Sequence, residues 1–136
     1  MLLYDEINGL TQEVIGRAIE VHREMGPGLL ESVYEECLAV ELRAANLQFF
    51  RQRPVPIRYK GVELKSDLKL DLLIEDKLVV ELKSVHELVP LFDAQVLTYL
   101  KLTNISVGLL INFNVRVLKH GLKRLICPSA AEPNDL

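Results

Sequence analysis

Apolar side chains in the first third of the chain recur at intervals of three and four residues. From about Leu10 to Met25 this spacing predicts a helix that packs on one face, with Asn8 or Thr11 available as its N-cap. Gly26-Pro27-Gly28 must end that helix. The same spacing returns from Leu30 to about Ala45, so the sequence predicts that two packed helices open the domain.

The pattern then changes to that of strands. Pro54 to Tyr59 predicts an edge strand, because proline is tolerated at the edge of a sheet but not in its middle. Lys60-Gly61 predicts a turn, and Leu64 to Ile74 predicts one or two further strand pieces. Leu78 to Lys83 predicts the next strand.

A third helix and more strands follow. Pro90 stands at a tolerated first-turn position before a segment with helical spacing. Ile105 to Asn112 is almost continuously apolar, as in a strand buried on both faces, and Val115 to Leu118, with or without Arg124 to Ile126, predicts an edge strand. The order of elements predicts an α/β fold with a mixed central β-sheet flanked by helices.

Length and composition indicate one globular domain. The chain has 136 residues, of which 49% are hydrophobic and 26% charged, which suffices for a single core. We expect residues 1–127 to form this domain and residues 128–136 to form a flexible tail. The longest apolar run, Ile105 to Ile111, is too short to cross a bilayer, and acids near the N-terminus differ from a secretory signal, so the sequence predicts a cytoplasmic protein.

Charge and cysteine content limit the chemistry. A formal net charge of −3 gives no general attraction to phosphates, which counts against a protein that coats DNA. A nuclease is not excluded, because bound metal ions offset the charge of its carboxylates. Cys37 and Cys127 are too few for a four-thiolate zinc or iron–sulfur site, so we expect no iron–sulfur cluster.

Charged side chains interrupt two apolar runs between Leu70 and Lys83. If Glu75-Asp76-Lys77 is the loop, Ile74 faces Leu78, and counting outward makes Asp71 the cross-strand partner of Glu81. Two opposed carboxylates with Cβ atoms about 5 Å apart can share a divalent cation. Alternation predicts one face with Leu70, Leu72, Ile74, Leu78, Val80 and Leu82, and another with Asp71, Leu73, Val79, Glu81 and Lys83.

Three motifs resemble a known family. Asp71 followed by Glu81-Leu82-Lys83 resembles the catalytic core of the PD-(D/E)xK nuclease superfamily, with Leu70 in place of the proline. Gln95 to Tyr99 is similar to the Gln-x-x-x-Tyr element of its exonuclease-like branch. Gly28 to Tyr34 fits the Gly-x-x-Glu-x-x-Tyr pattern of the small GxxExxY protein family. The resemblance covers roughly residues 5 to 127.

This resemblance implies a restriction-endonuclease-like core (αβββαβ) with an extra N-terminal helix. It also implies hydrolysis of nucleic acid, DNA more than RNA, with Mg²⁺ or Mn²⁺ as cofactor. The implied metal ligands are Glu31, Asp71 and Glu81, the implied catalytic residues are Lys83, Asp71 and Glu81, and the residues implied to order the substrate are Gln95 and Tyr99.

Simpler interpretations stay open for the same residues. The acids and Lys83 can form an ordinary surface ion pair, Glu31 can complement a helix dipole, and Tyr34 can simply pack. His22 is more typical of a satisfied core histidine than of a ligand. The alternative function is a catalytically silent module that binds nucleic acid or a protein partner, with a homodimer as one form, so enzyme activity is uncertain from the sequence.

Overall fold

The structure is a computed structural model that describes residues 2–128, with side chains from Asp5 onward. Its helices are α1 (Leu2–Met25), α2 (Glu31–Ala44) and α3 (Pro90–Thr103), with a short 3-10 turn, η1 (Leu118–Gly121). Its strands are β1 (Phe49–Pro54), β2 (Ile57–Tyr59), β3 (Val62–Leu64), β4 (Lys69–Ile74), β5 (Leu78–Lys83), β6 (Val107–Asn112) and β7 (Leu122–Ile126).

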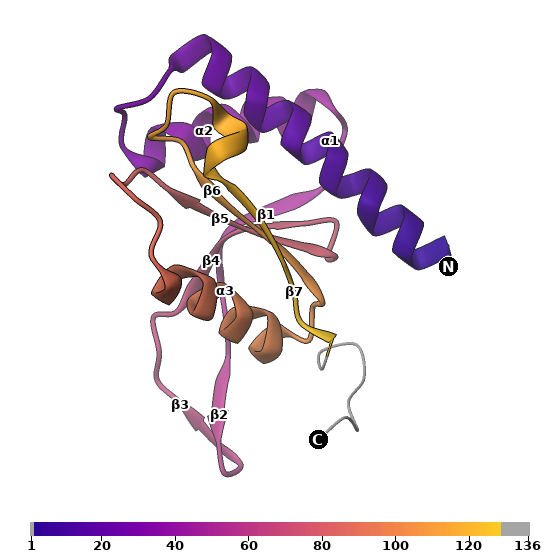
Figure 1. Ribbon diagram of the computed structural model, residues 1–136. Helices are drawn as coiled ribbons and strands as arrows, with labels where there is room; N and C mark the ends of the chain where they lie inside the picture. Colours follow the sequence, from indigo (N-terminus) through magenta and orange to yellow (C-terminus); the bar gives the residue numbers. More distant parts are fainter. Residues whose placement is uncertain (1, 129–136) are drawn as a thin grey trace.

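A five-stranded sheet in the order β1-β4-β5-β6-β7 forms the centre of the molecule. Strands β5 and β6 pair in parallel, and the other neighbours pair antiparallel. Helices α1 and α2 cover one face of the sheet, and α3 covers the other (Figure 1). The α/β fold predicted from the sequence, a mixed sheet between helices, is confirmed.

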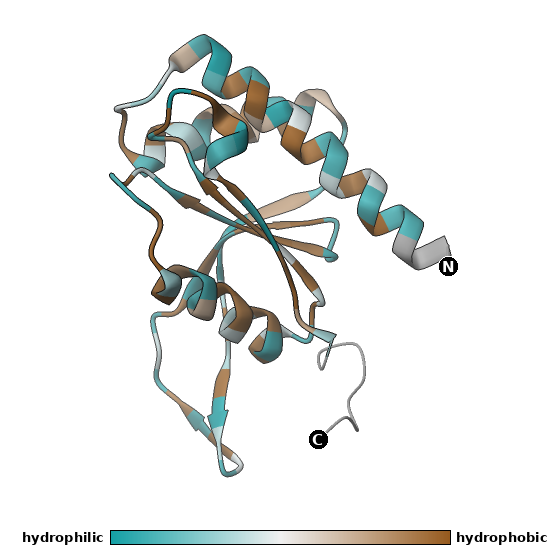
Figure 2. Ribbon diagram, in the orientation of Figure 1, coloured by the Kyte–Doolittle hydropathy of each residue, from teal (hydrophilic) through white to brown (hydrophobic). Residues whose placement is uncertain are grey.

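The apolar residues of the sheet form one core on each face. Brown, hydrophobic positions predominate in the central strands, whereas the helices alternate brown and teal positions (Figure 2). The α1/α2 side contains Leu72, Ile74, Leu78, Val80, Leu82, Leu109 and Ile111, and the α3 side contains Leu70, Leu73, Val79, Val96, Leu100 and Leu110. Strand β6 is buried along its whole length, as predicted.

The first helix begins earlier than predicted. α1 runs through both Asn8 and Thr11, so neither residue is its N-cap, and that prediction is wrong. Thr11 Oγ1 instead donates a hydrogen bond to the carbonyl of Ile7 at 2.7 Å, as a threonine inside a helix often does. Ile7 is buried in the core, so packing of this early turn outweighs the capping signal.

The edge strand of the sheet is β1, but its bounds differ from those predicted. The segment from Pro54 to Tyr59 is divided, because β1 ends at Pro54 and β2 pairs with β3 in a separate two-stranded sheet. Pro54 and Pro56 have no N–H to donate, and the pairing partner changes between them. The predicted turn at Lys60-Gly61 is confirmed, with φ of 50° and 80°.

The last edge strand is β7, and the strand predicted from Val115 to Leu118 is wrong. The Val115 carbonyl accepts a hydrogen bond of 2.7 Å from His22 Nε2, which joins this segment to α1 instead of to the sheet. This bond also confirms His22 as a satisfied core histidine. The predicted extension, Arg124 to Ile126, is part of β7.

Two predictions concern the ends of the chain and the membrane. Of the tail predicted as flexible, residues 129–136 lie outside the described part of the structure. No helix among the described residues is both long and apolar enough to cross a membrane.

Candidate functional site

The β4–β5 hairpin has the predicted loop, Glu75-Asp76-Lys77. Ile74 pairs with Leu78, and Lys77 donates its backbone N–H to the Ile74 carbonyl at 3.0 Å. Glu75 and Asp76 both adopt left-handed backbone, with φ of 54° and 53°. The same register continues to Leu72 and Val80, and its next position places Asp71 beside Glu81.

Two hydrogen bonds through the side chains of Asp71 and Glu81 cross between their strands. The backbone N–H of Asp71 donates to Glu81 Oε1 at 3.1 Å, and the backbone N–H of Leu82 donates to Asp71 Oδ2 at 2.8 Å. Side-chain bonds therefore replace regular strand pairing at this position, because the regular pairs end at Leu72 and Val80. The structure brings together the two acids that the sequence predicted as partners.

Glu81 is a buried carboxylate with only 6% of its surface exposed. Burial first, and then the neighbouring charge of Asp71, raise its pKa to about 9, while Lys83 acts to lower it. The same pair of acids acts on Tyr99 of α3, whose pKa is raised by burial first and then by the charges of Glu81 and Asp71. Tyr99 is thus part of the electrostatic environment of the two acids, while its role in ordering the substrate stays a prediction.

The predicted division of the hairpin into two faces is wrong at Leu70. Leu72, Ile74, Leu78, Val80 and Leu82 share the α1/α2 core as predicted, but Leu70 lies in the α3 core. The alternation of side chains between the two faces is interrupted at Asp71, which lies opposite Gln52 of β1. Gln52 has φ of 52°, which is rare for a residue in a strand, and the pairs around it are Arg51 with Leu72 and Arg53 with Leu70. This local distortion could not be read from period-two alternation.

Glu35 and Gln52 also belong to the site, and sequence reasoning missed both. Gln52 Nε2 donates to Glu35 Oε1 at 2.6 Å and to Asp71 Oδ1 at 3.3 Å, so one amide bridges two acids. Arg51 Nε donates to Glu35 Oε2 at 2.9 Å. Glu35 is buried and has helical spacing with Leu38 and Leu42, so an acid at an inward position was the signal in the sequence.

Glu31 lies at the exposed start of α2 and lines the same pocket as Asp71. This pocket has a volume of about 380 Å³, and its lining is Glu31, Ser32, Glu35, Gln52, Asp71 and Leu82. Among the described residues, no group of three His, Cys, Asp or Glu side chains has the arrangement of a metal site. The third ligand role of Glu31 therefore stays a prediction.

The donor set at Asp71 and Glu81 nevertheless fits a hard divalent cation. Carboxylate oxygens are the ligands that Mg²⁺ and Mn²⁺ prefer. The described residues donate a hydrogen bond to Oε1 of Glu81 but none to Oε2. A cation between the acids would also offset the like charge that raises the pKa of Glu81.

Lys83 lies two residues beyond Glu81 and is half-buried. Its Nζ lies 4.5 Å from the centre of the Phe92 ring, so the ammonium group packs on the first turn of α3. Gln95 follows on the same helix, one turn before Tyr99, and in the described part of the chain no hydrogen bond joins Gln95 to the acids. The catalytic role of Lys83 and the substrate role of Gln95 stay predictions.

Tyr34 holds the loop that leads into α2. Its hydroxyl donates to the Gly26 carbonyl at 2.6 Å and accepts from the Leu29 N–H at 3.1 Å, while its buried ring stacks on Phe113 at 4.4 Å between centroids. Gly28 has φ of 98°, which glycine adopts without strain. In the Gly-x-x-Glu-x-x-Tyr pattern, the glycine and tyrosine thus shape the loop that positions Glu31.

The segment after Lys83 is held by buried polar contacts. Asn112, at 2% exposure, accepts from the Val85 N–H at 3.1 Å and donates to the Val85 carbonyl at 3.0 Å. Ser84 Oγ donates to the Leu29 carbonyl at 2.5 Å. The segment after β5 is therefore hydrogen-bonded to both β6 and the loop before α2. These bonds fix the position of Lys83 relative to Glu31.

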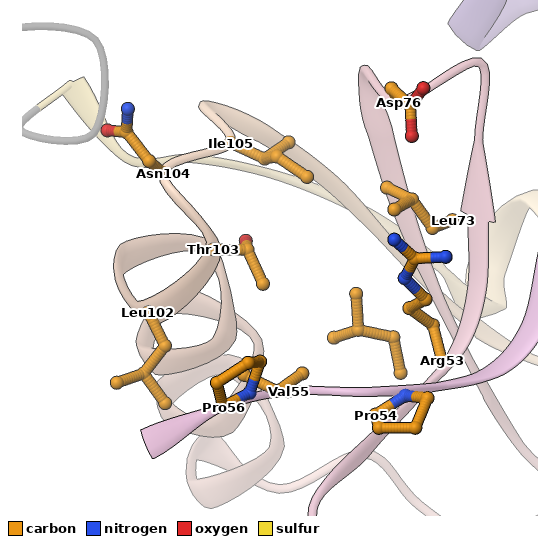
Figure 3. A pocket seen from close by; sticks show the side chains of 11 residues that line it. Arg53, Pro54, Val55, Pro56, Leu73, Asp76, Leu102, Thr103, Asn104 and Ile105 are labelled. Carbon is orange, nitrogen blue, oxygen red and sulfur yellow. The ribbon is translucent and has the colours of Figure 1, made fainter. Parts of the chain in front are cut away.

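A second pocket, of about 450 Å³, lies beside the end of α3 (Figure 3). It shares no lining residue with the acidic pocket. Its lining comes from β1 and the residues after it, from β4 and the β4–β5 loop, and from the end of α3, with Arg53 and Asp76 as its charged residues. It therefore lacks the group of three acids, Glu31, Glu35 and Asp71, that lines the first pocket.

Comparison with known families agrees with this geometry. A family model for the PD-(D/E)XK nuclease superfamily matches residues 8–125. The match extends from α1 into β7 and includes the β4–β5 hairpin. Searches of curated proteins and of solved structures found no match.

Proposed function

The chain belongs to the PD-(D/E)XK nuclease superfamily, and on this basis we propose that it hydrolyses phosphodiester bonds of nucleic acid with a divalent cation, Mg²⁺ or Mn²⁺. Nucleases of this superfamily generally use divalent metals, and its fold is restriction-endonuclease-like. DNA is the expected substrate. Membership of the GxxExxY family, a cytoplasmic location and a homodimer stay predictions from the sequence.

The observation that carries the proposal is the locked pair of Asp71 and Glu81. Their crossed hydrogen bonds hold two carboxylates together on adjacent strands, although burying one acid beside another is unfavourable. A structural hairpin has no need for this arrangement. A cation site does, because the ligands must be close before the ion binds.

In the proposed mechanism Asp71 and Glu81 hold the cation, and Glu31 approaches from the start of α2 as a further acid. When bound, the cation lowers the pKa of water and offsets negative charge on the phosphate. Lys83 contributes a positive charge that stabilises the transition state or orients the attacking water. Gln95 and Tyr99, one turn apart on α3, order the substrate beside the acids.

Glu35 and Gln52 act on the reaction through Asp71. The Gln52 amide fixes Asp71 Oδ1, and Glu35 fixes the amide in turn. Outer contacts of this kind orient ligands and typically change metal affinity by about 10- to 100-fold. We propose them as positioning residues.

A silent nuclease-like module is the alternative function. One observation favours it, since no group of three His, Cys, Asp or Glu among the described residues is arranged to hold a metal. Such a module would keep the hairpin and would bind nucleic acid or a protein without cleaving anything.

Cleavage assays test the proposal. Single- and double-stranded DNA and RNA would be incubated with the protein and Mn²⁺ or Mg²⁺, beside Asp71→Ala, Lys83→Ala and an EDTA sample. We expect metal-dependent cleavage by the native chain and a loss of at least a hundredfold in both variants. Glu24→Gln, an exposed change on α1 outside the acidic pocket, is the matched control and should cleave normally. Equal cleavage by all proteins, or none by the native chain, would support the silent module.

A further inference from the structure

A two-stranded arm projects from the sheet between β1 and β4. It comprises residues 53–69 and includes β2, the Lys60-Gly61 turn and β3, and Figure 1 shows it extending away from the body of the molecule. Its root is next to the acidic site. Arg53 pairs with Leu70, and the next residues along the two strands are Gln52 and Asp71.

The arm carries positive charge in a chain that is acidic as a whole. Residues 53–69 contain five basic side chains and two acidic ones, whereas the chain contains 16 and 19. All five bases, Arg53, Arg58, Lys60, Lys65 and Lys69, are exposed.

None of these five bases forms an ion pair with a described residue. The bases that do form ion pairs lie elsewhere and are Arg17, Arg23, Arg51, Lys77 and Lys123. Arg53 and Lys60 lie over aromatic rings, those of Phe50 at 4.1 Å and Tyr59 at 5.4 Å from the ring centre. The arm therefore presents a net positive charge to solvent, although Arg58 has Glu63 as its cross-strand neighbour.

The shape of the arm suits one groove of duplex DNA. Two strands about 4.8 Å apart make a ribbon narrow enough for the major groove, which is about 12 Å wide and about 8.5 Å deep. The arm has seven residues before its turn and eight after it, of which three on each side, β2 and β3, are paired strands. The paired part alone spans roughly 10 Å at about 3.3 Å per residue. That reach exceeds the depth of the groove.

From charge, shape and position together, we propose that the arm grips duplex DNA and directs it to the acidic site. This inference rests on the proposed function, because it assigns a duplex as the substrate class of that site. Arg58 and Lys60 contact phosphates near the tip, and Lys65 and Lys69 contact phosphates near the root.

A second copy of the chain is the competing occupant of the arm. One face of the ribbon is apolar, with Tyr59 and Val62 each 61% exposed and Leu64 44% exposed. Arg58 alternates with Ile57 and Tyr59 and so lies on the opposite face of the ribbon, where a second copy packed on the apolar face would leave its charge without a partner. DNA phosphates can pair with the basic side chains of the arm, while deoxyribose and thymine methyl groups can contact its apolar face. Duplex DNA is therefore the favoured occupant.

Binding as a function of salt tests the arm directly. A fluorescent 20-base-pair duplex would be titrated in EDTA, so that cleavage does not alter the probe, with single strands of the same sequence as competitors. We compare Arg58→Ala/Lys60→Ala with Arg116→Ala/Lys119→Ala, which removes the same charge from exposed positions near α1. The arm variant should bind about tenfold more weakly, and its slope of log Kd against log salt should fall by about 2. The control should behave like the native chain.

Several results would overturn the inference. These are no duplex binding by the native chain, equal changes in both variants, or stronger binding of single strands than of duplex. Light scattering on Tyr59→Ser/Val62→Ser adds another test. If the native chain is a dimer that this variant makes monomeric, and the salt slope of Arg58→Ala/Lys60→Ala is unchanged, the arm binds a second copy of the chain instead of DNA. If the arm variant binds and cleaves normally, the arm inference fails while the proposed nuclease stands. If the native chain neither binds nor cleaves, both fail.

Discussion

Asp71 and Glu81 hold each other's strands through crossed hydrogen bonds, from the Asp71 N–H to the Glu81 carboxylate at 3.1 Å and from the neighbouring Leu82 N–H to the Asp71 carboxylate at 2.8 Å. The acids thus take over the role of ordinary strand pairing at this position. Their separation is set by the backbone of the hairpin, which makes the site preorganised.

The buried carboxyl of Glu81 makes the stability of the metal-free protein depend on pH. Its pKa rises from 4.5 to about 9 on folding, so between these values the folded state holds more protons than the unfolded state. Stability must therefore fall as pH rises through this window. We expect Glu81→Gln to be more stable than the native chain at pH 8, by about 1–2 kcal/mol, and the difference to shrink near pH 5.

Urea unfolding in EDTA at pH 5, 7 and 8 measures this effect. Glu63→Gln removes an exposed acid and should follow the native pH dependence. Parallel curves for the native chain and Glu81→Gln would show that Glu81 does not hold a proton.

Divalent cations should stabilise the folded protein through Asp71. An ion present at about 100 times its Kd adds about 2.7 kcal/mol of stability, which a thermal melt detects as a higher Tm. The gain should grow between pH 6 and pH 8, because the ion displaces a proton from Glu81. Asp71→Asn should lose the gain. A Tm that rises equally in Asp71→Asn, or in KCl of the same ionic strength, would assign the effect to general screening.

The left-handed backbone of Gln52 allows a substitution that relieves backbone strain and at the same time removes its side-chain amide. Gln52→Gly relieves a φ of 52° but deletes the amide that links Glu35 to Asp71. We expect near-native stability with about tenfold weaker binding of Mn²⁺, measured by calorimetry. Lys60→Gly is the matched control, since it relieves a φ of 50° in the exposed arm turn. Native metal affinity in Gln52→Gly would exclude the positioning role.

Gly121 has no room for a side chain. A Cβ there would lie 2.2 Å from the carbonyl oxygen of Asn112, the residue that holds the segment after Lys83. Gly121→Ala should destabilise the protein by about 2–4 kcal/mol in urea unfolding, because backbone must move. Gly16→Ala, in α1 with open space around its Cβ, should stabilise it by about 0.5–1 kcal/mol. Two equal effects would contradict the close contact.

Much of the site followed from local pattern. The Glu75-Asp76-Lys77 loop sets the register of the hairpin, so counting residues sufficed to place Asp71 beside Glu81. Glu35 and Gln52 could not be found this way. Their contact joins α2 to an edge strand, and the distance between these elements depends on how the helix packs on the sheet.

The sequence by itself determined the helices, most strands, the hairpin register and the superfamily motifs, because periodicity and turn chemistry act between neighbours in the chain. Tertiary structure decided what depends on contacts between distant elements. It extended α1 through Asn8, directed Leu70 to the α3 core, buried Glu81, and tied Gln52 to Glu35. It also left the arm's basic residues without ion pairs. Burial and pairing are properties of the packed chain, which no local pattern contains.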